Sequence, residues 1–261
     1  MKSLITGGRG FIAGYLADYL VSLGDEVTID SVNVVPGVYP GIDMYRPDRV
    51  FHLAGLTSVV DSFGRPYEYF ETNTLGTLNV LEAARLEDPH PKVLFASSGT
   101  RYNAASPYGF SKWAAEVVAD AYYWCYKMPV YIARIFGTTG VGKKGDVVND
   151  WCEQAVKSGH IRHGNLDMYR DISDVRDVVR ALDLITESGT PGFPYDVGYG
   201  FPRSIREFAA SFGVPLDYDP ARVRPGERTT HEAKTNPLKA LGYEPKYTFE
   251  ETVAWVKESY R

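Results

Sequence analysis

The sequence predicts an α/β protein built on a doubly wound parallel β-sheet. Five segments of strand length recur along the chain, at residues 2–6, 26–30, 49–55, 93–96 and 130–136. Most of them are continuous apolar runs, which are typical of strands buried on both faces. Segments with helical periodicity separate them, and strands that alternate with helices form parallel sheets through right-handed crossovers.

Composition excludes several classes of protein. The chain has 261 residues, of which 44% are hydrophobic and 23% charged, and this suits one large globular domain. A net charge of −5 provides no electrostatic footprint for nucleic acid or an anionic membrane, and no apolar run approaches bilayer-spanning length. Cys125 and Cys152 lack metal-like spacing, and His160 and His163 have no third ligand nearby. We therefore expect a cytoplasmic protein without a metal site.

A glycine-rich stretch at 6–14, TGGRGFIAG, connects the first strand to a helix, and the next strand ends on Asp30. Glycines let the backbone approach a pyrophosphate, the helix N-terminus supplies amides, and the acid accepts from ribose hydroxyls. Asp30 favours NAD because a carboxylate repels the 2′-phosphate of NADP, although Arg9 can offset this repulsion, so NADP stays open. The combination predicts a Rossmann-type dinucleotide site formed by Gly7, Gly10, Phe11, Ile12 and Asp30.

The strand at 49–55 ends in small residues that let a cofactor approach closely, and its predicted cofactor contacts are Leu53, Ala54 and Gly55. His52 precedes them and is predicted to be a packed core residue. The following amphipathic helix, 67–86, contains Asn73. Two interpretations of Asn73 stay open: a structural group that holds neighbouring backbone, or a group at the cofactor site that positions a catalytic lysine.

A candidate catalytic stretch follows the strand at 93–96, where Ser97 and Ser98 occupy the strand end at which open α/β sheets bind ligands. Tyr108 and Lys112 follow in a Y-x-x-x-K spacing, which places both side chains on one helix face. A neighbouring ammonium lowers the pKa of a tyrosine, and a serine hydroxyl can hold the substrate oxygen. The spacing alone is weak evidence, and the glycine-rich turn strengthens it. Ser98, Tyr108 and Lys112 are the predicted catalytic residues.

The chain divides into a mainly dinucleotide-binding part, 1–136, and a mainly substrate-binding part, 137–261, with some later segments returning to the first. The basic loop at 137–145 is either solvated or contacts a phosphate through Lys143 or Lys144. Both interpretations stay open.

A charged run at 167–177 is predicted to be largely a solvated helix start, with Asp174 or Asp177 paired to arginines. Arg170 in this run and Arg224 in a later loop suit a diphosphate, because guanidinium groups bind phosphate oxygens in bidentate geometry. Either arginine could equally form a surface ion pair.

Together these motifs resemble the extended short-chain dehydrogenase/reductases, the NAD(P)-dependent epimerase/dehydratase family that acts on nucleotide sugars. The resemblance covers nearly the whole chain. Its motifs are TGGRGFIAG, VFHLAG at 50–55, ASS at 96–98, YGFSK at 108–112 and GNLDMYRDISDVRDVVRAL at 164–182. The last motif and DPARVRPGE at 219–227 are most similar to the branch with GDP-mannose 4,6-dehydratases and GDP-4-keto-6-deoxymannose reductases.

By position, the resemblance implies that Tyr108 is the acid/base, that Lys112 lowers its pKa and anchors the ribose, and that Ser98 binds a substrate hydroxyl. It implies NAD or NADP as cofactor and a nucleotide sugar as substrate. It also implies a homodimer formed through the helices at 67–86 and 111–127. Further substrate contacts are expected from Thr100, Asn165, Arg170 and Arg224.

The sequence departs from the dehydratases at Gly99 and Thr100, where an acid follows the serine in those enzymes. Elimination of water needs a base and an acid, so dehydration is disfavoured and hydride transfer at C4 of the sugar remains. We predict a 4-epimerase, with a 4-keto-6-deoxy sugar nucleotide reductase as the alternative. A small-carbonyl reductase and a non-catalytic NAD-binding sensor are less favoured.

Overall fold

The computed structural model describes residues 1–31, 33–34, 37, 39–103, 105–223 and 229–261. Within these residues the central sheet has six parallel strands: β1 (Lys2–Thr6), β2 (Glu26–Asp30), β3 (Arg49–His52), β4 (Lys92–Ser98), β5 (Val130–Ile135) and β10 (Pro194–Val197). Their order is β10-β5-β4-β3-β1-β2, so the winding reverses between β1 and β3, where open α/β sheets bind ligands. The predicted doubly wound sheet is confirmed.

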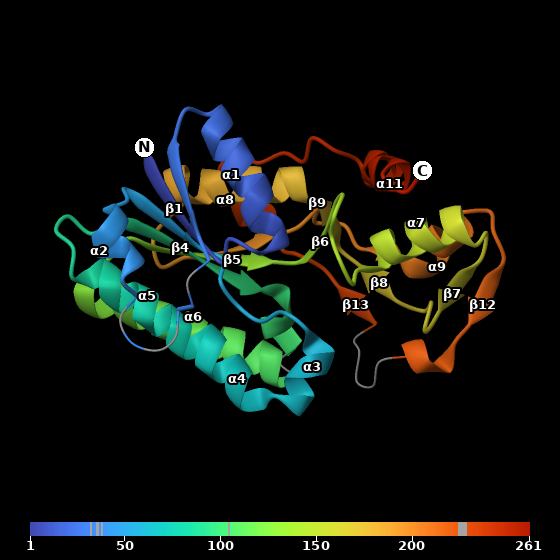
Figure 1. Ribbon diagram of the computed structural model, residues 1–261, viewed down its shortest axis with the longest axis horizontal. Coiled ribbons are helices and arrows are strands. Elements are labelled where there is room, and N and C mark those ends of the chain that lie inside the picture. Colours follow the sequence, from blue (N-terminus) through green and yellow to red (C-terminus); the bar gives the residue numbers. More distant parts are fainter. Residues whose placement is uncertain (32, 35–36, 38, 104, 224–228) are drawn as a thin grey trace.

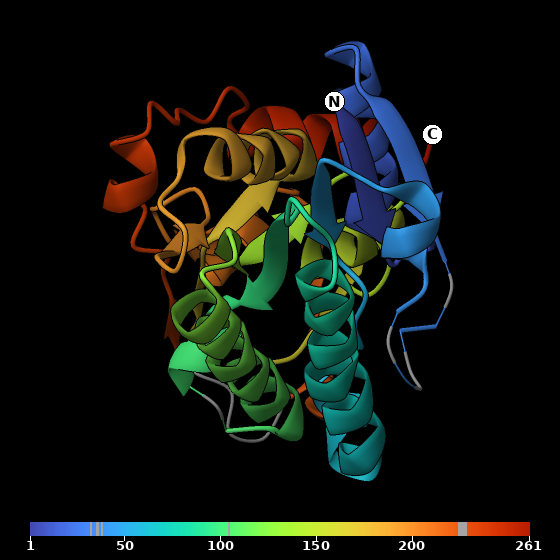
Figure 2. The ribbon, with the colours of Figure 1, turned by 90° about the vertical axis from the view of Figure 1, so that its left-hand side faces the viewer.

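Helices cover both faces of the sheet (Figures 1 and 2). One face carries α1 (Phe11–Ser22) and α8 (Val175–Ser188), and the other carries α5 (Gly76–Arg85) and α6 (Pro107–Tyr126), with the short α2 (Gly41–Tyr45) beside α5. Side chains that alternate along the strands pack against the helices on opposite faces of the sheet. Ile5, Phe51 and Leu94 lie on the first face, and Leu4, Val50 and Val93 lie on the second. Burial on both faces explains the apolar runs that predicted these strands.

The helix predicted at 67–86 is interrupted. It consists of α4 (Pro66–Phe70), a π-helical turn η1 (Glu71–Leu75) and α5, and a short helix α3 (Val59–Gly64) precedes it. Asn73 lies in the π turn and is fully buried. Such turns are frequent at functional sites, and apolar periodicity does not reveal them.

The C-terminal region packs around a separate apolar cluster that includes Trp151, Phe208 and Phe249. Beside the central sheet (Figure 1), β6 (Gly137–Thr139) pairs with β9 (Ile172–Asp174), β7 (Ile161–His163) with β12 (Leu216–Tyr218), and β8 (Tyr169–Arg170) with β11 (Arg203–Ser204) and β13 (Thr230–His231). The later helices are α7 (Val147–Lys157), α9 (Ile205–Ala210), α10 (Asn236–Lys239) and α11 (Phe249–Glu258).

The charged run at 167–177 is not a solvated helix start. It forms β8 and β9 before α8 begins, and Asp171, Asp174 and Asp177 are all buried. Hydrogen bonds from backbone amides to Asp171 and ion pairs at the other two make burial of these carboxylates tolerable. The expected pairing with arginines is confirmed, as Asp174–Arg176 and Asp177–Arg180.

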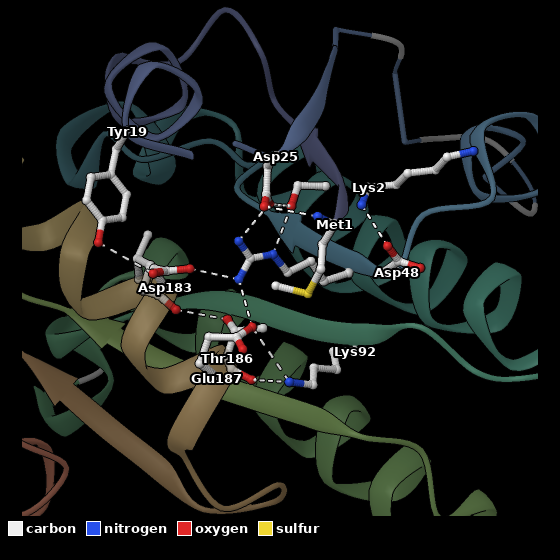
Figure 3. Close-up of polar contacts among 12 residues, drawn as sticks. Met1, Lys2, Tyr19, Asp25, Asp48, Lys92, Asp183, Thr186 and Glu187 are labelled. Atoms are coloured by element: carbon white, nitrogen blue, oxygen red, sulfur yellow. Dashed lines mark hydrogen bonds and ion pairs between the residues drawn. The ribbon is translucent and has the colours of Figure 1, made fainter. Parts of the chain in front are cut away.

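An ion-pair cluster lies at the N-terminal ends of the strands, opposite the carboxyl ends where ligands bind (Figure 3). Arg49, at the start of β3, is only 1% exposed, and its guanidinium lies 2.7 Å from Asp25, 2.7 Å from Asp183 and 2.9 Å from Glu187. These carboxylates come from the α1–β2 turn and from α8. A buried guanidinium is tolerated when several carboxylates surround it, and here they join α8 to the first strands.

Among the described residues, no helix is long and apolar enough to cross a bilayer, and no group of three or more candidate metal ligands occurs.

Candidate active site

The glycine-rich turn after β1 is shaped for close approach of a ligand. Gly7 has a φ of +76°, and a Cβ there would lie 2.6 Å from the backbone nitrogen of Ala54. Gly10 is the N-cap of α1 and supplies no side-chain cap to the helix. The first amides of α1, at Phe11 and Ile12, therefore face no capping side chain, as a pyrophosphate site requires. These residues fit a dinucleotide.

Asp30 ends β2 beside this turn, and its backbone carbonyl accepts the amide of Gly8 at 2.9 Å. Its carboxylate accepts a hydrogen bond from the phenol of Tyr39, a partner that the sequence did not predict. Burial and the Asp30 carboxylate together raise the pKa of Tyr39 above its ordinary value. The predicted ribose-binding acid therefore lies at the ligand-binding edge of the sheet and is oriented by Tyr39.

Residues from three elements meet at the end of β3. A Cβ on Gly55 would lie 2.9 Å from Asn73 Oδ1 and 3.1 Å from Lys112 Nζ, so a side chain there would displace them. The Lys112 ammonium donates to the carbonyl of Ala96 at 2.8 Å. Burial lowers the pKa of Lys112 to about 8, against the opposing effect of Glu116. The fold thus brings together the predicted cofactor residues that follow β3 and those of η1 and α6.

Asn73 holds neighbouring backbone. Its Nδ2 donates to the carbonyl of Leu56 at 3.0 Å and to Ser111 Oγ at 2.9 Å, and its Oδ1 accepts the amide of Leu56 at 2.8 Å. The structural interpretation of Asn73 is confirmed by these contacts. Its action on the lysine stays a prediction.

His52 is a packed core residue, as predicted. Its Nδ1 lies 2.8 Å from Thr6 Oγ1 and its Nε2 lies 3.2 Å from Thr77 Oγ1. Burial, with a smaller effect of Lys112, lowers the pKa of His52 to about 3. The imidazole is therefore neutral at ordinary pH and shares hydrogen bonds with Thr6 of β1 and Thr77 of α5.

The cluster predicted at the end of β4 is assembled. Thr100 Oγ1 donates to Ser98 Oγ at 2.9 Å, and both side chains lie close enough to the Tyr108 hydroxyl to lower its pKa. Tyr108 lies in the first turn of α6, which begins four residues earlier than the helix predicted at 111 and includes both Tyr108 and Lys112. The three hydroxyl groups can hold one substrate oxygen and exchange its proton.

The pKa of Tyr108 corrects one expectation. Burial raises this pKa, and the hydrogen bonds of Ser98 and Thr100 offset the effect only in part. Lys112 is not among the groups that lower this pKa, and burial disfavours the phenolate more strongly than Ser98 and Thr100 favour it. Tyr108 is therefore a protonated phenol in this structure.

A cavity of about 330 Å³ opens beside this cluster, within the size range of small-molecule sites. A Cβ on Gly99, between Ser98 and Thr100, would lie 2.7 Å from the ring of Phe136. A side chain at position 99 could enter the cavity only if Phe136 moved. Sequence reasoning missed most of this lining, because it joins distant segments: Gly99, Tyr102, Phe136, Thr230, His231, Glu232 and Lys234.

Glu116 is a second group that sequence reasoning missed. It is buried in α6, accepts from Ser97 Oγ at 2.5 Å, and pairs with Arg134 at 2.8 Å and Arg101 at 3.0 Å. These contacts tie α6 to β4, to β5 and to the 3₁₀ turn η2 (Gly99–Asn103) that carries Thr100. The available signal was its position four residues after Lys112, which places the two side chains on one helix face.

The predicted substrate-binding residues are less closely gathered. Asn165 is exposed and lines a separate cavity of about 300 Å³ with His163 and Tyr218. Arg170 lies in β8, where its Nη1 donates to the carbonyl of Tyr169 at 2.9 Å. Arg224 lies outside the described residues, so the arginine pair stays a prediction.

Known proteins resemble this chain over its whole length. The family model described as GDP-mannose 4,6 dehydratase matches residues 37–256. GDP-6-deoxy-D-mannose reductase from Pseudomonas aeruginosa is 28% identical over 287 residues, which cover 97% of this chain and 94% of that protein.

Two solved structures are similar in fold and sequence. The structure of RMD from P. aeruginosa in complex with NADPH has a TM-score of 0.84 and 27% identity, covering 99% of this chain and 98% of that one. The structure of UDP-glucose 4-epimerase from Thermus thermophilus in complex with NAD has a TM-score of 0.87 and 27% identity. The match covers 100% of this chain and 99% of that one.

These similarities confirm the resemblance drawn from the sequence motifs. They include a reductase and an epimerase, and the structures carry NADPH or NAD, in agreement with the predicted NAD(P) cofactor. The chain belongs to the GDP-mannose 4,6-dehydratase-like family of nucleotide-sugar epimerases, dehydratases and reductases, with the short-chain dehydrogenase/reductase fold.

Proposed function

We propose that this protein catalyses hydride transfer at C4 of the sugar of a nucleotide sugar, with NAD or NADP as the hydride carrier. One observation carries the proposal. Ser98, Thr100 and Tyr108 bring three hydroxyl groups together beside a small cavity, and Lys112 lies next to Gly55, in the region proposed for the dinucleotide. A bound nicotinamide supplies or accepts the hydride, and the protein supplies position and proton transfer.

In this proposal Tyr108 moves the proton of the C4 oxygen, while Ser98 and Thr100 donate hydrogen bonds that fix that oxygen. Lys112 binds the ribose, and the hydrogen bonds of Ser98 and Thr100 favour the phenolate that forms as Tyr108 gives up its proton. Asp30 accepts from the ribose hydroxyls at the other end of the cofactor.

The same site gives little support to dehydration. The elimination would need a second acid or base near C5 and C6, and position 99, where the dehydratases place one, is glycine. The ring of Phe136 occupies the space into which a residue 99 side chain would project. Redox chemistry confined to C4 therefore fits best.

Two forms of this chemistry have separate support. The 4-epimerase form, predicted from the sequence, is favoured by Asp30 at the end of β2, which suits tightly held NAD. A 4-keto sugar nucleotide reductase is favoured by the alignment with GDP-6-deoxy-D-mannose reductase and by the match to the GDP-mannose 4,6 dehydratase family.

Retention of the cofactor distinguishes the two forms. The purified protein would be denatured, and the released nucleotide identified by absorbance and mass spectrometry. Stoichiometric NAD, with interconversion of C4 epimers of UDP- or GDP-hexoses, would support the epimerase. Oxidation of added NADPH or NADH by GDP-4-keto-6-deoxymannose, without retained cofactor, would support the reductase. If neither activity appears and neither cofactor binds, the proposed function is wrong.

We also propose that the active protein is a homodimer, formed through α4 and α6. These neighbouring helices expose large apolar side chains, which suit burial against a second copy. They are Tyr67 and Phe70 on α4, and Phe110, Trp113 and Val117 on α6.

A further inference from the structure

The loop between β6 and α7 is anchored on α1, although it belongs to the C-terminal half of the chain. The phenol of Tyr15 in α1 donates to the carbonyl of Val141 at 2.8 Å. Gly140 packs so closely that a Cβ there would lie 3.3 Å from the ring of Phe11, the first residue of α1. These contacts hold the loop at the turn where the dinucleotide is expected.

The two lysines of this loop have different surroundings. The ammonium of Lys143 lies 5.0 Å from the centroid of the Phe11 ring and is partly buried, whereas Lys144 is exposed. Burial lowers the pKa of Lys143, and Asp146 opposes this through its charge, without a hydrogen bond. Asp146 itself caps α7, where its Oδ1 accepts the amide of Asn149 at 2.8 Å.

A partly buried ammonium in this place is unfavourable by itself. The N-terminus of α1 carries the positive end of the helix dipole, its first turn contains no acidic residue, and no side chain caps it. The contact with the Phe11 ring compensates the lost hydration of Lys143 only in part. An anion at the glycine-rich turn would be stabilised by the helix amides and by the ammonium together.

We propose that Lys143 is a cofactor-binding residue that neutralises the diphosphate of the dinucleotide from the C-terminal half of the chain. The proposal rests on the proposed function, because it requires NAD or NADP at the glycine-rich turn. It assigns Lys143 to the ligand and leaves Lys144 as a surface residue.

Direct binding tests this assignment without catalysis. After any retained nucleotide has been removed, NADH and NADPH would be titrated into the protein and binding followed by fluorescence or calorimetry. The proteins compared are the wild type, Lys143→Met, Lys143→Arg and Lys144→Met. Loss of the charge at Lys143 is expected to raise Kd about tenfold, whereas Lys143→Arg and Lys144→Met stay within about threefold of the wild type. The salt dependence of Kd should also become shallower in Lys143→Met.

Thermal unfolding without nucleotide shows whether the variants fold. Lys143→Met should melt at or above the wild-type temperature, because it removes an unfavourable cation, yet gain less from added NADH. The assignment is overturned if Lys143→Met binds both dinucleotides like the wild type. It is also overturned if the variant loses affinity for GDP and UDP but not for NADH or NADPH. A wild type that retains no nucleotide and binds neither dinucleotide would refute the proposed function itself.

Discussion

The phenol of Tyr39 donates a hydrogen bond to the carboxylate of Asp30, and this contact orients the acid at the end of β2. The two residues lie nine positions apart in the sequence, Asp30 at the end of β2 and Tyr39 shortly before α2. A carboxylate held at this edge of the sheet can accept from ribose hydroxyls and repels a 2′-phosphate.

Replacement of Asp30 by alanine should therefore shift the cofactor preference toward NADPH. We expect the ratio of the Kd values for NADH and NADPH to rise by about tenfold or more, because NADH loses an acceptor and NADPH loses a repulsive charge. Tyr39→Phe is the matched control, since it removes the hydrogen bond and keeps the charge, so its ratio should stay near that of the wild type. Titration of NADH and NADPH into each protein measures this ratio of Kd values. An unchanged ratio in Asp30→Ala would exclude the role of Asp30 at the ribose.

Replacement of Tyr108 by phenylalanine should lower kcat by about 10³-fold, because it removes the group that moves the proton. The Kd for NADH should stay within about twofold, since the phenol is expected to act on the substrate oxygen. Tyr122→Phe provides a control on the same helix, where the hydroxyl bonds Glu82 away from the site. Steady-state kinetics would be measured with the nucleotide sugar on which the wild type proves active. A Tyr108→Phe enzyme with activity close to that of the wild type would contradict the prediction.

Stability should fall in mild acid because of His52. Its pKa in the folded protein is about 3, below the ordinary value of 6.5, so below pH 6.5 the unfolded chain takes up a proton that the folded chain refuses. The free energy of unfolding should therefore decrease as pH falls from 6.5 toward 3, with a loss of about 2 kcal/mol at pH 5 from this group.

Denaturant unfolding at pH 7.5 and pH 5 tests the effect of His52. His52→Gln keeps an amide that can hydrogen bond and cannot take up the proton, so this variant should lose less stability between the two pH values. The exposed His160 is the control, and His160→Gln should follow the wild type. Identical losses in the wild type and His52→Gln would show that another group causes the acid sensitivity.

A charge on the exposed face of α6 should dissociate the proposed dimer. Val117→Glu places a carboxylate on this apolar surface, where its burial against a second copy would be costly. Light scattering after gel filtration should give twice the chain mass for the wild type and the chain mass for the variant. Val21→Glu, on the exposed side of α1, should remain dimeric. A monomeric wild type would end the dimer proposal.

Local patterns along the chain were sufficient to predict the sheet, the glycine-rich turn and the Ser98, Tyr108 and Lys112 cluster. Strand burial produces apolar runs, and a helix places residues four apart on one face. The parallel sheet then brings the ends of β3 and β4 to one edge, so the residues that follow them must lie near each other. Topology and spacing therefore predict which of these groups meet.

The environment of each group, in contrast, follows from the packing of distant segments. Burial raises the pKa of Tyr108 above its ordinary value. Asp171, in a charged run that was predicted to be solvated, is buried and accepts a backbone amide. The distinction between Lys143 and Lys144 depends on contact with Phe11, far away in sequence. Desolvation and charge pairing depend on which distant segments pack together, and local patterns along the chain do not reveal that packing.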